Sequence, residues 1–458
     1  MTDELSAPGG TRAAVSAPTG GVTESRLAAA DICADLRTGE MLDPAFDRRA
    51  GALDARDRRW TQELVYSMLR RRAGIDALLS ERVRGGLARL DPDVTDLLRL
   101  GASQLLHMHS VPAYAAIAQT VELTKRRHGI GASRLVNAVL RRLDRERDGL
   151  AIPTPADPLD ALALAYSHPR WLVARWVARW GADETEQLLA ANNREAPVIV
   201  RPYGIVREQL EAKLESAGVH VEDAPLVRDS IRLSSPAAFT ELGAFRQGLF
   251  FVQDPAATLV TQYASLPAGY IVADLCAAPG GKTLELSRNA ALVIAADRSL
   301  TRQQRLIDTI RRVESRNVTV LVADALAPPI RTVDAVLLDA PCTATGTFRR
   351  HPDARWRLKP SDLATMTATQ RGMLRSAARL VRPGGLLIYS TCSLEPEEND
   401  AQIEAFLAEH ADWALEPPPD GVVPQTVIDA GRLRVHPHRH GADGAFAARL
   451  RKGAGGNG

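Results

Sequence analysis

Short apolar segments alternate with helical segments from about residue 250 onward, and this alternation constrains the fold more than any other feature. The expected strands are IVADLCA (271–277), LVIAAD (292–297), VTVLVAD (318–324), VDAVLLDA (333–340) and GLLIYSTC (385–392). A helix is expected over 302–314, between the second and third strands. Nearly continuous apolar strands that alternate with helices predict a parallel sheet covered by helices on both faces.

Polar side chains lie at the ends of these predicted strands. Three strands end in Asp297, Asp324 and Asp339, and the last ends in Cys392. Asp274 comes late in the first strand. Because ligands of open parallel sheets bind at the carboxyl ends of the strands, these residues predict a ligand site at that edge of the sheet.

A glycine-rich loop, CAAPGGKT (276–283), follows the first of these strands and precedes a helix. A phosphate-binding loop has the pattern GxxxxGK[ST], and its last three positions match Gly281, Lys282 and Thr283. Cys276 stands where that pattern needs its first glycine, so a P-loop NTPase is disfavoured. The GxGxxG pattern of dinucleotide-binding folds is absent.

The spacing after this loop favours a nucleoside cofactor such as S-adenosylmethionine, whose amino-acid part can lie against the loop. Asp297 comes 17 residues after Gly280, close to the place where an acid holds ribose hydroxyls. Asp324, at the end of the third strand, is placed to meet the adenine. The alternative interpretation is a glycine turn with capping acids and no ligand.

The N-terminal part, residues 24–147, shows only helical periodicity. Apolar residues recur at three- and four-residue steps in 61–72, 94–108, 115–129 and 133–146, which predicts a helical bundle. Residues 51–150 contain 18 Lys plus Arg against 12 Asp plus Glu. This excess is consistent with either a nucleic-acid surface or an ordinary solvated face.

The rest of the chain divides by composition. Residues 1–23 are rich in Gly, Pro, Ser, Thr and Ala and predict a disordered tail, with no signal peptide. A proline-containing linker is expected at 148–160, followed by a small α/β module at 161–249. The large α/β domain is expected at 250–452, and a short tail at 453–458.

Composition and cysteine usage exclude several classes. Hydrophobic residues make up 45% of the chain and charged residues 24%, as in water-soluble globular proteins, and no apolar run is long enough to span a bilayer. The four cysteines, Cys33, Cys276, Cys342 and Cys392, are too scattered for a disulfide framework and form no CxxC pair. We expect a cytoplasmic, monomeric protein with no metal site and no membrane contact.

Two cysteines lie just past strand ends, in loops that face the expected ligand site. Cys342 lies in DAPCTATGTFRRHPDARW (339–356) and Cys392 in YSTCSLEPEEN (389–399). One such cysteine would usually be a packing residue. Two, both flanked by Pro, Ser or Thr, point to chemistry at this edge.

These segments and DLCAAPGGKT resemble the motifs of RNA 5-methylcytosine methyltransferases. The helical part, with DARDRRWTQELVYSMLR (54–70), LRLGASQLL (98–106) and LVNAVLRR (135–142), resembles a NusB-type domain. The combination, over about residues 24–451, resembles the RsmB (Sun/Fmu) family, which modifies a cytosine in small-subunit ribosomal RNA. It implies an α/β Rossmann-like class I methyltransferase domain with one antiparallel strand near its end, preceded by an all-α NusB-like domain and a small α/β module.

The resemblance also implies residue roles. A thiolate adds to carbon 6 of cytosine and makes carbon 5 nucleophilic. In the family the Thr-Cys cysteine, here Cys392, is the nucleophile, and the Pro-Cys cysteine, here Cys342, assists product release. Asp339 is suited to hydrogen bonding at ring nitrogen N3. The pocket for S-adenosylmethionine and the base is then lined by Cys276, Ala277, Ala278, Pro279, Gly280, Gly281, Lys282, Asp297, Asp324 and Asp339.

The segment after Cys342 is basic and departs from the family pattern. Its cations Arg349, Arg350, His351, Arg355 and Arg357 are expected to grip RNA phosphates, or else to lie on a helix surface outside the site. Three residues differ from those usual in the family: Ala344 replaces a glycine, Arg355 a lysine and Ala445 an aromatic. None is a proposed catalytic residue, so these departures bear on substrate fit.

Three functions compete at this point. The first is a small-subunit (16S) rRNA cytosine-C5 methyltransferase that acts through a covalent cysteine–C6 adduct. The second is a related enzyme acting on large-subunit rRNA or tRNA, which the NusB-like domain disfavours. The third is a non-catalytic RNA-binding factor for ribosome assembly or transcription, which would need neither Cys342 nor Cys392.

Overall fold

The computed structural model describes residues 21–234 and 239–454, which form two compact units. The first unit contains the described residues up to Glu40 together with Pro44–Met68 and Ile75–Ala151. The second contains Met41–Asp43, Leu69–Gly74 and the described residues from Ile152 onward. The disordered tail expected at residues 1–23 lies mostly outside the described ranges, and so does most of the short tail expected at 453–458.

The N-terminal part is all helical, as its periodicity predicts. Its helices are α1 (Glu24–Arg37), α2 (Leu42–Ala50), α3 (Ala55–Arg70), α4 (Arg72–Ser80), α5 (Pro92–His107) and α6 (Ala113–Arg145). The start of α5 is fixed by Pro92 in its first turn and by Asp91, whose carboxylate accepts the Asp93 N–H at 2.8 Å. The segments expected as separate helices at 115–129 and 133–146 both lie in α6, which is kinked at Gly129 (φ 79°).

A smaller module follows, built on a four-stranded antiparallel sheet. Its helices are α7 (Pro158–Ala165), α8 (Arg170–Trp180), α9 (Ala182–Asn193), α10 (Arg207–Ser216) and α11 (Gly243–Arg246). Its strands are β1 (Val198–Pro202), β2 (Val221–Asp223), β3 (Ile231–Leu233) and β4 (Phe250–Val252), in the order β2-β3-β1-β4. β4 pairs with β1, although it lies just past the end expected for this module.

The C-terminal domain contains a nine-stranded mixed sheet. Its strands are β5 (Ile271–Asp274), β6 (Leu292–Asp297), β7 (Val318–Val322), β8 (Val333–Asp339), β9 (Val381–Thr391), β10 (Trp413–Leu415), β11 (Ile428–Asp429), β12 (Arg432–Val435) and β13 (Ala445–Lys452). The order is β11-β12-β13-β9-β8-β5-β6-β7, with β10 paired to β13. Strands β5 to β9 are parallel, and β13 runs antiparallel to β9. The expected Rossmann-like fold is confirmed.

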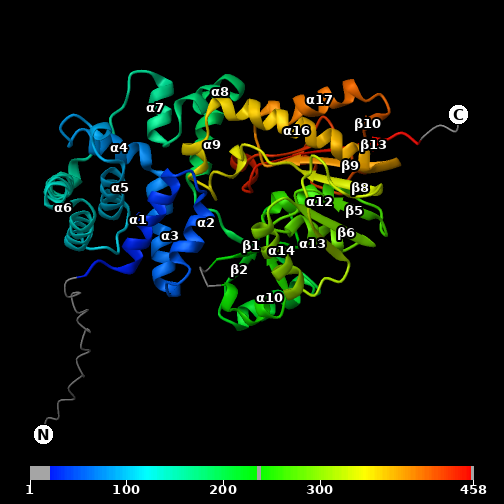
Figure 1. Cartoon of the computed structure of the whole chain (residues 1–458), viewed down its shortest axis with the longest axis horizontal. Coiled ribbons are helices and arrows are strands. Elements are labelled where there is room, and N and C mark those ends of the chain that lie inside the picture. Colours follow the sequence, from blue (N-terminus) through cyan, green and yellow to red (C-terminus); the bar gives the residue numbers. More distant parts are fainter. Residues whose placement is uncertain (1–20, 235–238, 455–458) are drawn as a thin grey trace, which may run out of the picture. The chain divides into compact units, whose positions relative to one another are not determined.

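Helices cover both faces of this sheet (Figure 1). α12 (Pro255–Ala264), α13 (Gly281–Ser287) and α14 (Leu300–Arg312) pack on one face, and α16 (Pro360–Leu380) and α17 (Asp400–Glu409) pack on the other. Two one-turn helices, α15 (Ala354–Arg357) and α18 (Pro437–His440), lie in the loops. In the described part of the chain, no helix combines the length and apolar character needed to cross a bilayer.

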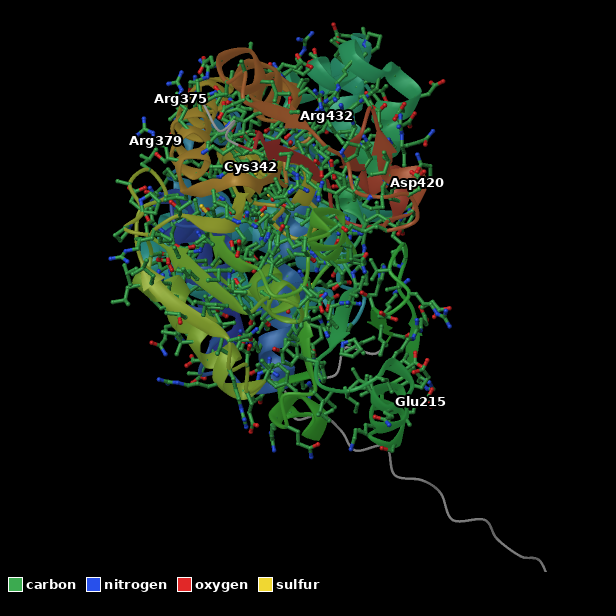
Figure 2. The ribbon with its side chains drawn as sticks, turned by 90° about the vertical axis from the view of Figure 1, so that its right-hand side faces the viewer. Glu215, Cys342, Arg375, Arg379, Asp420 and Arg432 are labelled. Atoms are coloured by element: carbon green, nitrogen blue, oxygen red, sulfur yellow. The ribbon has the colours of Figure 1, made fainter. Side chains whose placement is uncertain are left out.

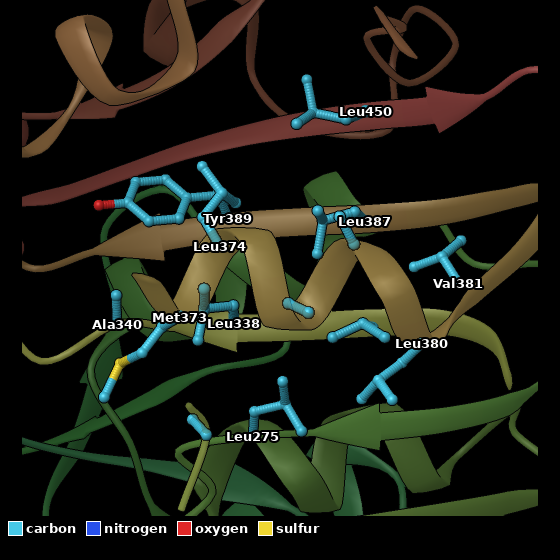
Figure 3. Close-up of a cluster of buried hydrophobic side chains, with 14 of the residues drawn as sticks. Leu275, Leu338, Ala340, Met373, Leu374, Leu380, Val381, Leu387, Tyr389 and Leu450 are labelled. Atoms are coloured by element: carbon cyan, nitrogen blue, oxygen red, sulfur yellow. The ribbon is translucent and has the colours of Figure 1, made fainter. Parts of the chain in front are cut away.

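The core on the α16 face of the sheet is made mostly of aliphatic side chains, with Met373 and a few aromatic residues that include Tyr389. Met373 and Leu374 of α16 lie over Leu338 of β8 and Leu387 of β9 (Figure 3). These four side chains are almost completely buried, and so is Tyr389. This packing fixes the register of β8 against β9, which end at Asp339 and Thr391.

The strand order reverses between β5 and β8, which are neighbours in the sheet although β6 and β7 come between them in the sequence. In open sheets this is the place where loops diverge to opposite faces and leave a crevice for a ligand. The loops that follow β5, β8 and β9 therefore meet at one edge. These are the loops singled out in the sequence.

Leu387→Ala tests the contribution of this core. The side chain is fully buried, so its truncation leaves a cavity and should lower the free energy of unfolding by about 2–5 kcal/mol. Leu300→Ala is the matched control, because Leu300 is 66% exposed and should change stability little. Urea denaturation of both variants gives the comparison, and equal effects would contradict the packing described here.

Candidate active site

The glycine-rich loop turns tightly from β5 into α13. Gly280 has φ 112°, a conformation that side chains disfavour, and a Cβ there would lie 2.3 Å from Leu306 Cδ1. Gly281 begins α13. The sequence therefore needs glycine at position 280 for conformation and packing, and the loop backbone stays open to a ligand.

Asp297 and Asp324 lie at the ends of neighbouring strands beside this loop. Buried Asp297 accepts hydrogen bonds from the Ser299 N–H (2.9 Å) and the Ala278 N–H (3.3 Å), which ties the end of β6 to the loop. Asp324 is exposed two residues past β7 and accepts the Leu326 N–H at 2.9 Å. Both carboxylates thus lie at the carboxyl ends of two neighbouring strands, β6 and β7.

Asp339 connects the loops after β5, β8 and β9. Lys282 Nζ lies 2.7 Å from its Oδ2, and Ser390 Oγ donates to its Oδ1 at 2.7 Å. Burial by itself lowers the pKa of Lys282, but the charge and hydrogen bond of Asp339 outweigh it, so this pKa is raised. Lys282 therefore stays protonated and forms an ion pair with Asp339 at the site.

The two loop cysteines face each other. Cys342 Sγ lies 3.2 Å from Cys392 Sγ, a contact close enough for a proton to be shared between the sulfurs. The hydrogen bond to Cys392 and burial raise the pKa of Cys342 well above its ordinary value. The other two cysteines lie elsewhere. Cys276 begins the glycine-rich loop, residues 276–283, which we call the cofactor loop, and burial raises its pKa. Cys33 is buried in α1.

Two glycines clamp the cysteine loops to the start of β13. Gly346 donates its N–H to Cys392 O at 3.0 Å, and Gly444 donates to Gly346 O at 2.8 Å. A Cβ on Gly346 would lie 2.6 Å from Gly444 Cα and 2.7 Å from Cys392 O, so no larger residue fits without moving backbone. The next residue, Ala445, is buried in β13 and pairs with Val435.

The basic segment does not form the expected RNA grip. Arg349 is buried between Asp254 and Asp443, and Arg350 pairs with the same two carboxylates. The prediction that Arg349 and Arg355 contact phosphate is wrong, and so is the alternative of a helix surface, because buried ion pairs hold Arg349 and buried hydrogen bonds hold Arg355 inside the domain.

Arg355, which replaces the lysine usual in the family, uses its guanidinium for buried hydrogen bonds. Its guanidinium is fully buried and donates to Asn193 Oδ1 at 2.7 Å and to Asn192 O at 3.0 Å. Arg357 pairs with Asp353 at 2.9 Å. Exposed arginines lie instead on α16, where Arg375 and Arg379 extend outward while Cys342 lies within the domain (Figure 2).

Ala344, another departure, adopts a left-handed backbone conformation with φ 56°. Such a conformation costs an alanine about 1–2 kcal/mol relative to right-handed alternatives, and glycine avoids that cost. The residue lies two positions after Cys342, at the turn that leads to the short helix Thr345–Thr347. The turn thus keeps a geometry that favours glycine although the glycine is absent.

Sequence reasoning missed two buried polar residues. Gln253 follows β4, is 6% exposed, and neither atom of its amide has a partner among the described residues. A Cβ on Gly281 would lie 3.2 Å from its Cδ, so the amide borders the cofactor loop. Glu398 is fully buried beside the cysteine loops. The polar clusters QD (253–254) and EPEEN (395–399) were the available signals.

These groups fit a cofactor with charged ends. The Gln253 amide and Asp274 Oδ1 are buried polar groups with no protein partner among the described residues, and a zwitterionic amino acid offers the donors and acceptors that both need. Asp297 and Asp324 border the same loop on the side of β6 and β7. Across the described ranges, no group of three or more His, Cys, Asp or Glu side chains is arranged to hold a metal ion.

The buried Asp274 predicts a pH-dependent stability. Burial raises its pKa to about 7, so the folded, ligand-free protein binds a proton that the unfolded chain releases near pH 4. Stability is therefore lost as pH rises from about 4 through 7. Asp274→Asn, which keeps an acceptor for Thr283 Oγ1, should remove this loss and stabilise the protein above pH 7 by at most about 4 kcal/mol.

Urea denaturation between pH 4 and 8 measures this difference. The gain in stability from Asp274→Asn should be absent near pH 4 and complete near pH 8. Asp324→Asn, at an exposed carboxylate, is the control. Parallel stability curves for Asp274→Asn and the unmodified protein would show that Asp274 ionises in the fold without cost.

Three protein families match the chain in the order of its domains. The NusB family matches residues 23–145, the ferredoxin-like domain of RsmF/B-like methyltransferases matches 168–240, and the family described as 16S rRNA methyltransferase RsmB/F matches 266–451. The second match falls on the small antiparallel module. The third covers the loops with both cysteines and the cofactor loop.

Whole-chain relatives agree with these matches. A Synechocystis protein named "Probable ribosomal RNA small subunit methyltransferase B" is 35% identical and covers 91% of this chain and 96% of its own. Ribosomal RNA small subunit methyltransferase B of Xanthomonas campestris is 36% identical over 93% of this chain and 99% of its own. The crystal structure of PH0851 shares 30% identity and superposes with a TM-score of 0.79, covering 94% of this chain and 99% of its own.

Proposed function

The chain belongs to the RsmB/F family of 16S rRNA methyltransferases, and from this membership and the site we propose that it methylates carbon 5 of a cytosine in small-subunit rRNA, with S-adenosylmethionine as methyl donor. We propose that it acts in the cytoplasm as a monomer. The names of its relatives favour small-subunit rRNA over the large subunit or tRNA.

The observation that carries the proposal is the cysteine pair beside Asp339. Cys342 and Cys392 lie 3.2 Å apart, on the loops after β8 and β9, and Asp339 ends β8. A non-catalytic RNA-binding protein needs no such pair. A covalent methyltransferase needs one thiolate to attack the base and a second group to help release it.

Each residue of the site has its own role in the proposed reaction. The Cys392 thiolate adds to carbon 6 of the cytosine, and the electron pair of the ring double bond moves toward carbon 5. The Lys282–Asp339 pair lies at the same edge, where it holds ring nitrogen N3 by hydrogen bonding. S-adenosylmethionine supplies an electrophilic methyl group, and carbon 5 accepts it. A base then removes the proton on carbon 5, the sulfur–carbon 6 bond breaks, and Cys342 assists this release.

The cofactor would lie along the loop after β5. Lys282 and the loop backbone meet its amino-acid part, Gln253 and Asp274 border that part, and Asp297 and Asp324 hold the ribose and adenine. RNA affinity is assigned to the NusB-like domain, whose exposed cations include Arg134 and Arg141 on α6. The target base must leave any duplex to reach the cysteines.

Cofactor identity is tested by calorimetry. The protein should bind S-adenosylmethionine and its demethylated product and not ATP, and Asp297→Ala should weaken that binding by about 10-fold or more because a hydrogen bond to a charged group is lost. Asp308→Asn on the exposed side of α14 is the control and should bind normally. Tight ATP binding with hydrolysis would support a phosphate-binding loop instead.

The covalent route is tested with the two cysteines. Cys392→Ala should abolish methylation and form no adduct with rRNA, because the attacking group is gone. Cys342→Ala should keep the attack but stall release, so a protein–RNA adduct should appear on a denaturing gel. Cys33→Ala, in α1, is the matched control and should behave as the unmodified protein.

The pattern of adducts separates the alternatives. An adduct in the Cys392 variant alone would move the nucleophile to Cys342. Full activity in both variants would exclude a covalent mechanism. Bisulfite mapping of rRNA with and without the gene would then locate the modified cytosine, and unchanged rRNA would contradict the proposed function as a whole.

A further inference from the structure

We propose that Glu398 is a positioning residue that assigns the single negative charge of the cysteine pair to Cys392 and keeps Cys342 a neutral thiol. The inference rests on the proposed function, in which Cys392 attacks and Cys342 assists. It explains how two sulfurs 3.2 Å apart can have different roles although both lie at strand ends of the same sheet.

Glu398 is fully buried and lies at the end of the short helix Pro396–Glu398. Its carboxylate faces only donors: the Thr343 N–H at 2.9 Å, the Gln370 amide at 3.0 Å and the Thr343 hydroxyl. Burial raises the pKa of Glu398 above its ordinary value, and these hydrogen bonds, together with one from the Ser393 side chain, partly offset the rise by stabilising the carboxylate. The donors therefore favour the ionised form that burial disfavours.

These bonds hold the loop on both sides of Cys342. Thr343, the next residue, donates twice to Glu398, while Gln370 bridges Glu398 and the carbonyl of Pro341, the preceding residue, at 2.9 Å. The carboxylate charge is therefore fixed beside Cys342 by backbone contacts. It binds both chain neighbours of Cys342, Thr343 directly and Pro341 through Gln370, and after Cys392 it binds only the Ser393 side chain.

The opposite charge lies on the side of Cys392. The Lys282 ammonium interacts with Cys392 as well as with Asp339, and the charge of Glu398 contributes to the raised pKa of Cys342. The pair thus lies between a cation and an anion: Lys282 favours a thiolate at Cys392, and Glu398 disfavours one at Cys342.

Other charged or titratable groups lie around the pair. Tyr389, from β9, interacts with Cys342, and burial keeps this phenol neutral by raising its pKa. Asp339 also interacts with Tyr389, and the Lys282 ammonium compensates the Asp339 charge. The Asp274 carboxylate interacts with Lys282 as well. The Ala344 N–H faces Cys342 and lowers its pKa, which opposes Glu398 but is outweighed. The proton that remains on Cys342 can then be donated to the Cys392 sulfur.

Glu398→Gln tests this assignment. Glutamine keeps an oxygen to accept from Thr343 N and Gln370, and its amide can donate to the Thr343 hydroxyl, so the loop contacts survive while the charge is lost. Alkylation by iodoacetamide from pH 6 to 10, with each cysteine quantified by mass spectrometry, reports thiolate at each sulfur separately. Neither RNA nor cofactor is present, so this experiment and the methylation assay can fail independently.

The unmodified protein should alkylate first at Cys392. In Glu398→Gln the pKa of Cys342 should fall, so its alkylation at pH 7 should rise about tenfold or more relative to Cys392. Glu398→Asp, which restores the charge, should return the preference to Cys392. Glu397→Gln, at a carboxylate paired with Arg175 on the surface, should leave the ratio unchanged.

Three results would overturn the proposal. The first is a Glu398→Gln protein with a normal circular dichroism spectrum and an unchanged ratio of alkylation. The second is a preference for Cys342 in the unmodified protein, which needs no variant to fold. The third is an equal change of the ratio in Glu397→Gln and Glu398→Gln.

Discussion

The hydrogen-bonded ion pair between Lys282 and Asp339 is the interaction on which the site depends. It joins the first helix turn after β5 to the end of β8, and Ser390 joins the same carboxylate to β9. These three strands are neighbours because the sheet order reverses between β5 and β8. One half-buried carboxylate therefore sets the spacing between the cofactor loop and both cysteine loops.

A second set of contacts brings the C-terminal strand into the site. Gly346 and Gly444 approach each other so closely that neither position has room for a side chain. Next to that contact, Asp254 and Asp443 form ion pairs with Arg349 and Arg350. The segment after Cys342 is thus fixed by buried charge and close packing. Its arginines stabilise the loop, whereas cations that are exposed lie elsewhere, on α6 and α16.

Charge also distinguishes the two cysteines. The sequence places each in a polar loop, and neither loop alone shows which sulfur attacks. We propose that the Lys282 ammonium and the Glu398 carboxylate make the two sulfurs differ in their tendency to carry the negative charge. In the proposed mechanism, a single proton shared between two sulfurs at 3.2 Å then suffices for one nucleophile and one assisting thiol.

The sequence by itself determined the strands, their polar ends and the glycine turn, because apolar periodicity and the conformational needs of Gly280 are local properties. It also indicated Asp297, Asp339 and the two cysteine loops. Only the tertiary structure decided that Arg349 and Arg355 are buried and that Gln253 and Glu398 border the site. The residues that they contact lie far away in the chain, and whether a charged side chain meets solvent or a buried carboxylate depends on which distant segments fold against it.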